Sequence, residues 1–421
     1  MLLIKGGKVF GAETNPSDIL LKDGKIASIA ENIEQTSEMT VIDASGKTAA
    51  PGFVDLHVHF REPGFEYKED IRTGSAAAAA GGVTTCLCMP NTYPKADNFT
   101  TISLIAEKGK NASVRVLPVG AVTIGQNGEQ LTDFKALKKA GAKALSDDGN
   151  PIQSAEIARR AMQEAKKLDM VIISHCEDEK MVRNYAVNEG RVSEALGLPG
   201  RPASAEDIMV ARDVLLAQET GAKVHIAHIS TATSVAIIRY AKKHGIPVTA
   251  ETCPQYFSLT EEAIFSHGTL ARVNPPLRTA NDVDAIIEGL ADGTIDAIAT
   301  DHAPHSEKEK ALPIEDAPSG MIGLETSLAV AVTYLYHTGK LPMDKIIKLM
   351  STNPARIFGI DGGTLQVGSR ADVVIFDPYE KWQVQPSDFR SKARNTPYAQ
   401  MELFGKVKYT MVQGEIVYRE K

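Results

Sequence analysis

The chain has 421 residues, of which 43% are hydrophobic and 24% are charged, as in ordinary globular proteins. Its formal net charge of −7 provides no cationic excess for binding a nucleic acid, so this class of partner is not expected. The length exceeds that of one small domain and is sufficient for a large barrel with a satellite domain.

The N-terminus and the cysteines indicate where the protein works. The stretch MLLIKGGKVFG has one short apolar run, interrupted by Lys5, and predicts neither a secretory signal nor a membrane span. Cys86 and Cys88 are too close to pair easily, and Cys176 and Cys253 stand alone, so the four cysteines form no disulfide framework. We therefore expect a cytoplasmic protein without a membrane partner.

The two ends of the chain have the pattern of short β-strands. In residues 1–50, apolar runs alternate with the turn pairs Gly6-Gly7, Asp23-Gly24 and Ser45-Gly46. Residues 356–421 repeat this pattern in GTLQVGSRADVVIFD and VKYTMVQGEIVYRE. We expect both termini to build a single small β-sandwich that flanks the main body.

The middle of the chain, residues 51–355, alternates apolar strands with helical patterns. Strand-like runs such as PGFVDLHV, VTTCLCM and MVIISHC are separated by segments such as SAEIARRAMQEAKKL and ATSVAIIRYAKKH. About eight such units predict a (β/α)₈ TIM barrel, with an open doubly wound sheet as the alternative. The barrel is favoured because the unusual polar residues follow the strands, where barrel enzymes carry their chemistry.

These strand ends are rich in histidine and aspartate. His57 and His59 are two positions apart, and Arg61 follows, so an extended strand would place all three on one face. Imidazole and carboxylate groups are the ligands that zinc and similar ions prefer, and four histidines with two aspartates suffice for two metals sharing a bridging carboxylate. The further candidates at later strand ends are Asp147, Asp148, His175, His225, His228, Asp301 and His305.

Several assignments stay open from the residues alone. Asp147 and Asp148 point to opposite sides of a continuing strand, and periodicity does not choose between them. Lys143 is a further option, because a carbamylated lysine can bridge two metals, although a lone lysine is usually solvated. His225 and His228 cannot both face inward from one strand; His228, nearer the strand end, is the better ligand.

The remaining polar residues suggest hydrolysis of a small anionic substrate. Asp301 could accept a proton from the attacking water and deliver it to the leaving nitrogen, which suits cleavage of an amide or ester. The forked guanidinium of Arg61 pairs well with a carboxylate. Asn91, Asn274 and His305 are hydrogen-bonding residues on loops over the same rim, although both asparagines lie beside proline and could serve turns alone.

Several longer motifs resemble those of a known family. DLHVHFREPG, GGVTTCLCMPNTYP, ALSDDGNPI, VSEALGLPGRPASAE, HIAHISTATS, ETCPQYF, RVNPPLR and ATDHAPH look like the bacterial class I dihydroorotases of the amidohydrolase superfamily. The resemblance runs in order from about residue 1 to residue 420, flanking β segments included. It implies a (β/α)₈ barrel with a small β-sandwich, and the interconversion of dihydroorotate and N-carbamoyl-L-aspartate in pyrimidine synthesis.

The resemblance also implies a role for each matching residue. It makes Asp148 the bridging carboxylate and Asp301 the general acid–base, with one or two Zn²⁺ ions in the site. Arg61, Asn91 and His305 match groups that hold the substrate carboxylate and ring, Asn274 matches a ring-contacting residue, and the backbone at Ser319 and Gly320 matches a further contact. The implied metal ligands are His57, His59, Asp148, His175, His228 and Asp301.

Two features near the end of the barrel leave questions open. Many relatives have Phe where this chain has Ser319, a departure that could alter packing over the ring. The charged stretch 305–320, HSEKEKALPIEDAPSG, lacks periodicity and is either a mobile lid beside the site or a solvated surface loop.

Three other functions are alternatives to this one. One alternative is a sister cyclic amidohydrolase (allantoinase, hydantoinase or dihydropyrimidinase). Arg61 disfavours dihydropyrimidinase, whose substrate has no ring carboxylate, and the combination of MPNT and NPPLR disfavours allantoinase. A non-catalytic subunit is disfavoured because all six ligands are present, and a metal-binding protein without catalysis because of Asp301. We expect a homo-oligomer, a dimer, with an aspartate carbamoyltransferase complex as a further option.

Overall fold

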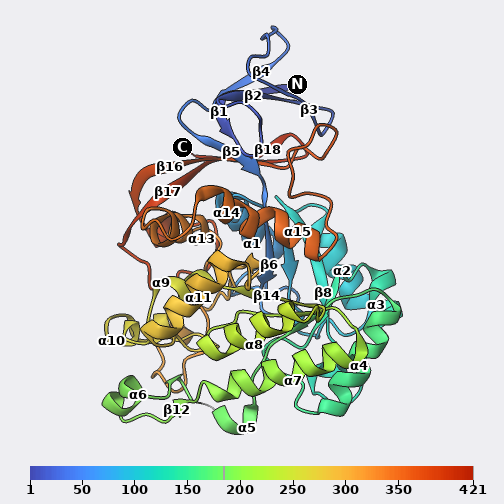
Figure 1. Ribbon diagram of the computed structural model, residues 1–421, viewed down its shortest axis with the longest axis vertical. Coiled ribbons are helices and arrows are strands. Elements are labelled where there is room, and N and C mark those ends of the chain that lie inside the picture. Colours follow the sequence, from blue (N-terminus) through green and yellow to red (C-terminus); the bar gives the residue numbers. More distant parts are fainter. Residues whose placement is uncertain (184, 421) are drawn as a thin grey trace.

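The protein consists of a barrel and a second sheet that lies at one end of it (Figure 1). The computed structural model describes residues 1–183 and 185–420. Within these residues eight parallel strands form the barrel sheet, in the order β15-β14-β13-β10-β9-β8-β7-β6. The strands are β6 (Phe53–Val58), β7 (Val83–Cys88), β8 (Arg115–Gly120), β9 (Ala144–Ser146), β10 (Ile172–Ser174), β13 (Val224–Ile226), β14 (Val248–Thr252) and β15 (Ala297–Ile298).

The barrel strands are buried because both of their faces are covered. Every residue of β6 and of β7 is buried, as expected for parallel strands between side chains inside the barrel and helices outside it. Strand order follows chain order, with β6 and β15 at the two ends of the sheet. A parallel bridge between Val58 and His302, with a hydrogen bond of 2.9 Å from His59 N to His302 O, joins these ends.

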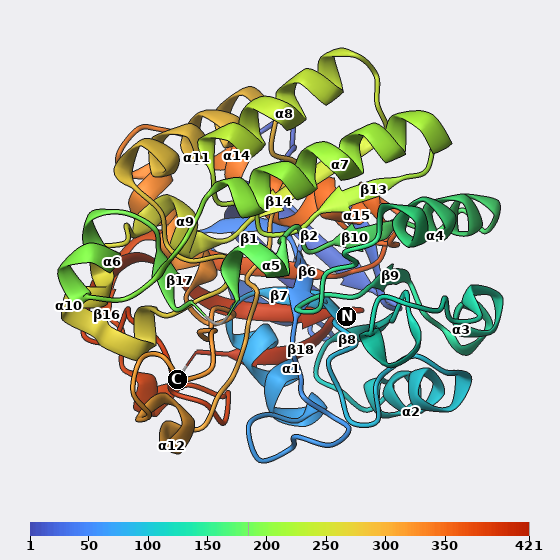
Figure 2. The ribbon, with the colours of Figure 1, turned by 90° about the horizontal axis from the view of Figure 1, so that it is seen from below.

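Helices cover the outside of the barrel. In Figure 2, α2, α3, α4, α7, α8 and α11 form an arc around the strands. In α4, the hydroxyl of Ser154 accepts a hydrogen bond from Ile157 N at the N-cap, and the apolar face from Ile157 to Ala165 is buried. The main covering helices are α1 (Ile71–Ala80), α2 (Phe99–Gly109), α3 (Phe134–Ala140), α4 (Ala155–Lys167), α7 (Ser204–Thr220), α8 (Ala232–Lys243), α11 (Ala280–Asp292) and α13 (Ser327–Ala331), which continues as a π-helix over Val332–Tyr336.

Shorter elements lie in the connections. A two-stranded parallel pair, β11 with β12, follows β10 and is part of a long insertion before α7. The short elements are 3₁₀ turns at Ile124–Gln126, Gly268–Ala271 and Pro386–Asp388, a π-helical segment at Lys348–Thr352, and α5 (Glu179–Val182), β11 (Val187–Asn188), α6 (Arg191–Leu196), β12 (Gly200–Arg201), α9 (Pro254–Ser258), α10 (Ala263–His267), α12 (Glu307–Lys310), α14 (Met343–Ile347) and α15 (Asn353–Ile357).

The second sheet joins the two ends of the chain, coloured blue and red at the top of Figure 1. Its order is β18-β17-β16-β5-β1-β2-β3, with β4 beside β1, and β5 pairs antiparallel with β16. Buried residues from both termini, among them Ile4, Ile19, Val373 and Met411, share one apolar cluster. Its strands are β1 (Leu2–Val9), β2 (Ser17–Lys22), β3 (Lys25–Ala30), β4 (Thr40–Asp43), β5 (Thr48–Pro51), β16 (Val373–Gln383), β17 (Glu402–Val412) and β18 (Glu415–Arg419).

The fold class predicted from the sequence is confirmed: a (β/α)₈ barrel carries a flanking β structure built from both termini. The prediction of a turn at Gly6-Gly7 is wrong, because β1 runs through these residues with an irregular register and Gly6 at φ +67°. The turns at Asp23-Gly24 and Ser45-Gly46 do separate strands. The division into 1–50, 51–355 and 356–421 stays a prediction.

The described part of the chain contains no helix that is both long and apolar enough to span a bilayer.

Candidate active site

One end of the barrel collects six histidine and aspartate side chains. His57 lies in β6 and His59 just after it, while the other four follow β9, β10, β13 and β15, as expected for the carboxyl ends of barrel strands. Each of the six residues is at most 7% exposed. They are the six that the resemblance implied as metal ligands: His57, His59, Asp148, His175, His228 and Asp301.

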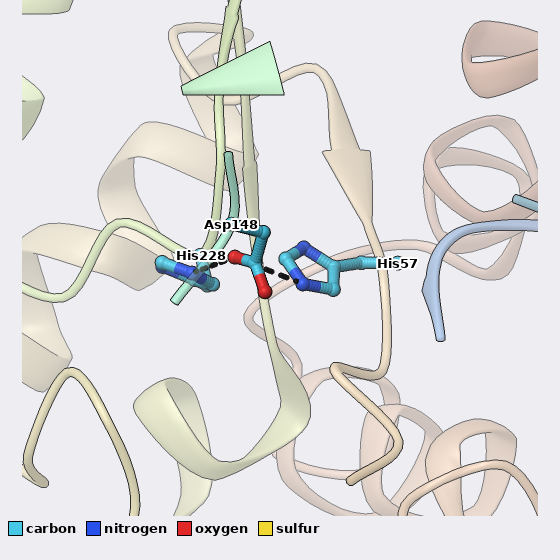
Figure 3. Close-up of side chains that lie close together, drawn as sticks. All are labelled: His57, Asp148 and His228. Carbon is cyan, nitrogen blue, oxygen red and sulfur yellow. Dashed lines mark hydrogen bonds and ion pairs between the residues drawn. The ribbon is translucent and has the colours of Figure 1, made fainter. Parts of the chain in front are cut away.

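The carboxylate of Asp148 lies at the centre of this group, between the imidazoles of His57 and His228 (Figure 3). Asp148 Oδ1 is 3.3 Å from His57 Nε2, 3.4 Å from His228 Nε2 and 3.5 Å from His175 Nδ1. Its second oxygen, Oδ2, is 3.5 Å from His59 Nε2. One carboxylate therefore faces all four histidines, the arrangement that a bridging ligand requires.

Asp301 also lies close to two of these histidines, His57 and His59. Asp301 Oδ1 is 3.0 Å from His59 Nε2 and 3.6 Å from His57 Nε2. The ligand atoms of His57, His59 and Asp301 all lie within 4.8 Å of one another, as do those of His57, Asp148 and His228. Two overlapping three-ligand groups therefore share His57.

The residues of this group fit a divalent metal. His57 Nε2 is buried and has no hydrogen-bond partner among the described residues, although two carboxylates lie close to it. Nδ1 of His175 is only 2.8 Å from Nε2 of His228. Both nitrogens carry a lone pair in the form that binds a metal, so without a metal the two lone pairs point at one another. Buried nitrogens and carboxylates that converge in this way are typical of zinc sites.

Burial and charge act in opposite directions on the two aspartates. Burial tends to raise the pKa of Asp148, but the charge of His57 and hydrogen bonds from His175 and His228 outweigh it and hold this pKa well below its usual range. Burial likewise tends to raise the pKa of Asp301, and the hydrogen bond from His59 with the charge of His57 lowers it. Both side chains are therefore carboxylates at neutral pH.

Three site residues have backbone conformations that are unusual for side-chain-bearing residues. Arg61, His228 and Asp301 have φ values of +59°, +32° and +48°. Such left-handed conformations cost roughly 1–3 kcal/mol each and concentrate at functional sites, where the surrounding structure enforces them. Here they turn each side chain toward the barrel mouth directly after a strand.

The structure distinguishes between the alternatives that the sequence left open. Asp147 turns away and accepts hydrogen bonds from Val122 N (2.8 Å) and Thr123 N (3.1 Å), so Asp148 alone enters the group. Lys143 donates to Gly359 O and does not reach the site.

The expectation that His57, His59 and Arg61 share one strand face is wrong in part. Strand β6 ends at Val58, and Arg61 reaches the rim through its left-handed backbone in the loop that follows.

Two outer carboxylates, which the sequence reasoning did not assign, hold the histidines. Glu251 at the end of β14 accepts from His57 Nδ1 (3.0 Å) and from His225 Nε2 (3.1 Å), and His225 Nδ1 is 2.8 Å from Thr249 Oγ1. Burial tends to raise the pKa of Glu251, but these bonds lower it to about 2. A charged residue at the end of an apolar strand was the signal that could have identified Glu251.

Glu177 has the same role beside His175. Its Oε2 is 3.6 Å from His175 Nε2, and its Oε1 accepts from Arg201 Nη1 at 2.9 Å. Arg201 also donates to Asn274 Oδ1, while Asn274 Nδ2 is 3.3 Å from His175 Nε2. Glu177, Arg201 and Asn274 therefore form one network that fixes the orientation of the His175 ring.

A cavity of about 200 Å³ opens over the metal-binding group. Arg61 donates through Nε to Pro304 O (3.3 Å), and Asn91 donates through Nδ2 to Asp148 O (2.6 Å). Asn91 Oδ1 is buried and has no partner among the described residues. Besides metal-set residues, the lining includes the six predicted substrate contacts: Arg61, Asn91, Asn274, His305, Ser319 and Gly320.

The segment 305–320 closes one side of this cavity. Lys310 is 5% exposed, and its ammonium donates to Pro318 O (2.9 Å) and Gly320 O (3.1 Å). Gly320 has φ +132°, and an added Cβ would lie 3.1 Å from His305 Nε2, so the site requires glycine here. The hydroxyl of Ser319 accepts from Arg272 Nε at 3.3 Å. Whether the segment moves as a lid stays a prediction.

Comparison with solved structures agrees with this architecture. The L-hydantoinase (dihydropyrimidinase) from Arthrobacter aurescens matches with a TM-score of 0.89 at 28% identity, over 99% of this chain and 96% of that one. A D-hydantoinase (dihydropyrimidinase) from Thermus sp. matches with a TM-score of 0.86 at 25% identity, over 100% and 95%. The barrel, the flanking β structure and the buried histidine–aspartate group define a cyclic amidohydrolase.

Comparison of sequences identifies the family. The Dihydro-orotase-like family model matches residues 46–234. Proteins named Dihydroorotase from Pelotomaculum thermopropionicum and Acetivibrio thermocellus are 51% and 49% identical, each over 100% of this chain and 99% of the relative. The chain belongs to the dihydroorotase family.

Proposed function

We propose that this chain catalyses the reversible hydrolysis of the cyclic amide of (S)-dihydroorotate to N-carbamoyl-L-aspartate, the third step of de novo pyrimidine (UMP) biosynthesis. The observation that supports this substrate is that Arg61 and the histidine–aspartate group line the same cavity. Dihydroorotate carries a ring amide for hydrolysis and a carboxylate that a guanidinium can bind.

We propose that one or two Zn²⁺ ions occupy the site, with Asp148 as the bridging ligand if there are two. Support comes from the two three-ligand groups and from the unpartnered Nε2 of His57. The remaining proposed ligands are His59, His175, His228 and Asp301. A bound metal supplies Lewis-acid polarisation of a carbonyl and lowers the pKa of a bound water.

Asp301 acts as the general acid–base in this proposal. The side chain is an ionised carboxylate that can accept the proton of the attacking water, and Oδ1 lies among the metal-binding nitrogens. The same oxygen then returns the proton to the ring nitrogen that leaves when the amide C–N bond breaks. In the reverse direction Asp301 removes a proton from the ureido nitrogen.

The substrate is held by further groups that line the same cavity. Arg61 binds the carboxylate with the terminal nitrogens of its guanidinium, since Nε is engaged by Pro304 O. The unpartnered Oδ1 of Asn91 accepts a hydrogen bond from a ring N–H. Asn274 contacts the ring edge, and the backbone at Ser319 and Gly320 provides a further contact. The substrate contact through this backbone does not depend on the side chain of residue 319.

The test is an assay of the purified, metal-analysed protein on dihydroorotate, allantoin and dihydrouracil in parallel. Turnover of dihydroorotate above the other two is the expected result, because neither competitor has the carboxylate that Arg61 would bind. The similarity to hydantoinase (dihydropyrimidinase) structures makes dihydrouracil the critical competitor. Turnover of dihydrouracil alone would overturn the proposed substrate.

We also propose a cytoplasmic location and a homodimer, with aspartate carbamoyltransferase as a further candidate partner. All four cysteines are free and buried, which suits a reducing compartment. Size-exclusion chromatography with light scattering, with and without the carbamoyltransferase from the same organism, measures both assemblies.

A further inference from the structure

Two groups lie within 3.3 Å of the ring nitrogens of His305, and each of them can take only one hydrogen-bond role. Lys68 Nζ lies 3.3 Å from His305 Nδ1, and an ammonium can only donate. The backbone carbonyl of Ser319 lies 2.9 Å from His305 Nε2, and a carbonyl can only accept. Nδ1 must therefore carry the lone pair and Nε2 the hydrogen, which selects one neutral tautomer.

The surroundings of the ring keep it neutral. Burial lowers the pKa of His305, and the positive charges of Arg61, Lys68 and Lys310 lower it further. The nearby carboxylate of Glu309 pairs with Lys68 and not with the His305 ring. A doubly protonated ring would point an N–H at an ammonium, so no second proton can be placed without breaking the Lys68 contact.

Lys68 is itself held in place by a contact between two loops. Its ammonium is 2.7 Å from Glu309 Oε1, which also accepts from Tyr67 Oη at 3.1 Å. Glu309 Oε2 accepts from Ser306 N (2.9 Å) and Ser306 Oγ (2.7 Å), so the acceptor is fixed at the start of α12. The Lys68 side chain is 13% exposed. The ammonium therefore has a defined position over Nδ1.

The hydrogen on His305 Nε2 lies on the same side as the guanidinium of Arg61. Arg61 Nη2 is 3.5 Å from Nε2, and because both atoms donate they cannot satisfy one another. Both residues line the cavity. The Nε2–H already donates to Ser319 O, so a carboxylate oxygen beside the terminal nitrogens of Arg61 would share this hydrogen with that carbonyl.

We propose that Lys68 is a positioning residue that holds the proton of His305 on Nε2, so that His305 and Arg61 together donate to the substrate carboxylate. This inference rests on the proposed function, since it assigns the carboxylate of dihydroorotate to these two donors. Without Lys68 the carbonyl of Ser319 alone favours the hydrogen on Nε2, and a hydrogen on Nδ1 no longer faces an ammonium, so the Nδ1–H tautomer becomes accessible. Nε2 then presents a lone pair to the carboxylate, which opposes binding.

The kinetic test replaces Lys68 and compares substrate affinity with turnover. Lys68→Met should raise KM for dihydroorotate about tenfold, the value of one charge-assisted hydrogen bond, and leave kcat within about threefold. Lys68→Arg retains a cationic donor and should restore most of the affinity. Lys308→Met makes the same change at an exposed lysine of α12 and should leave both constants unchanged.

A double-mutant cycle separates this role from a structural one. If Lys68 acts through His305, Lys68→Met should have no further effect on KM in a His305→Ala background. The proposal would be overturned if Lys68→Met raised KM equally in both backgrounds, or if it left KM unchanged in the native background. Turnover of dihydroorotate by the wild type would still support the proposed function in either case.

The tautomer can also be measured without any substrate. In protein labelled with ¹⁵N at histidine, long-range ¹⁵N–¹H spectra distinguish Nδ1–H from Nε2–H, and the His305 signals are those lost in His305→Ala. The expected result is Nε2–H in the wild type and a shift toward Nδ1–H in Lys68→Met. A wild-type ring with hydrogen on Nδ1 would contradict the inference even if the protein does not hydrolyse dihydroorotate.

Discussion

At the residue scale, the site depends on which nitrogen of each histidine faces the other ligands. His57, His59 and His228 direct Nε2 toward Asp148, whereas His175 directs Nδ1. The outward nitrogens of His57 and His175 face Glu251 and Glu177. A carboxylate behind a ligating imidazole fixes the tautomer and makes the ring a stronger ligand.

Replacing Asp301 tests its proposed role in proton transfer. Asp301→Asn keeps the shape of the side chain but cannot accept a proton, so kcat for dihydroorotate should fall by about 10²–10⁴-fold. The other five proposed ligands remain, so metal analysis should still find at least one ion per chain. Asp284→Asn, at an exposed position of α11, is the matched control. Retained turnover in Asp301→Asn would exclude this residue as the general acid–base.

Replacing Glu251 tests the carboxylate behind His57. Glu251→Gln keeps the volume but removes the charge that two buried imidazoles share, so the affinity for metal should fall about 10–100-fold. The measurement is zinc retained after dialysis against graded chelator concentrations, and it does not depend on activity. Glu288→Gln, an exposed change on α11, should retain metal like the wild type. Equal retention by both variants would show that Glu251 has no influence on the metal site.

At the scale of elements, short buried strands provide rigid starting points and the residues just after them provide the chemistry. β9, β10 and β13 have three residues each, and β15 has two. Each ends one to three residues before a proposed ligand, so the ligand is anchored by the sheet while its backbone is free to turn. The helices that cover the barrel must also pack closely against their neighbours.

Gly81, which ends α1, provides a test of that close contact. An added Cβ would lie 2.0 Å from the backbone oxygen of Leu324, which cannot move aside as a flexible side chain would. Gly81→Ala should lower the free energy of unfolding by about 3 kcal/mol, the upper end of the usual overpacking cost. Its φ of −86° suits alanine, so the cost is steric.

Gly46→Ala is the comparison, because its φ of +74° disfavours alanine while no atom lies within 4 Å of the added Cβ. A conformational cost of about 1–2 kcal/mol is expected there. Urea denaturation of both variants measures the two costs, and a Gly81→Ala cost no larger than that of Gly46→Ala would contradict the steric argument.

At the scale of the whole molecule, the barrel and the terminal sheet share apolar packing, with Phe53 and Val374 in one buried cluster. Glu325, just before α13, accepts hydrogen bonds from Arg390 N (2.9 Å) and Ser391 N (3.1 Å) in the segment between β16 and β17. Burial raises the pKa of Glu325 to about 7. A titratable group therefore lies at the contact between the two parts of the chain.

This group should make the stability depend on pH. Its folded pKa of about 7 exceeds the unfolded value of 4.5, so the folded state retains a proton that the unfolded chain releases. The resulting stability is complete below pH 4.5 and is lost as the pH rises through 7, by about 3 kcal/mol in total. Glu325→Gln should remove this dependence, and Glu315→Gln, at an exposed site, should keep it. The measurement is the free energy of unfolding from urea denaturation at pH 5 and pH 8. The same change in this free energy between the two pH values for Glu325→Gln and the wild type would refute the role of Glu325.

Much of the architecture and the composition of the site could be read from the sequence. Alternating apolar strands and helical segments predicted the barrel, because strand and helix periodicities are local properties of the chain. The histidines and aspartates were identified because each follows a strand, and parallel strands bring their carboxyl ends to one rim. The residue types at these ends also indicated metal chemistry, since imidazole and carboxylate in an apolar layer need a partner.

The sequence could not choose between Asp147 and Asp148, nor reveal that Glu251 lies behind His57. The first choice depends on hydrogen bonds to Val122 and Thr123, which belong to another strand–loop connection. The second depends on a contact between residues 194 positions apart. Neither arrangement leaves a periodic signal in the chain.

The sequence by itself therefore determined the kinds of side chain and their order along the barrel rim, because secondary structure places them there one strand at a time. Only the tertiary structure decided which atom of each side chain faces which partner. The tautomer of His305 shows why: it is set by Lys68, 237 residues away, and by a carbonyl on the loop that closes the cavity. Hydrogen-bond roles depend on distances and directions between groups, and these exist only after the chain has folded.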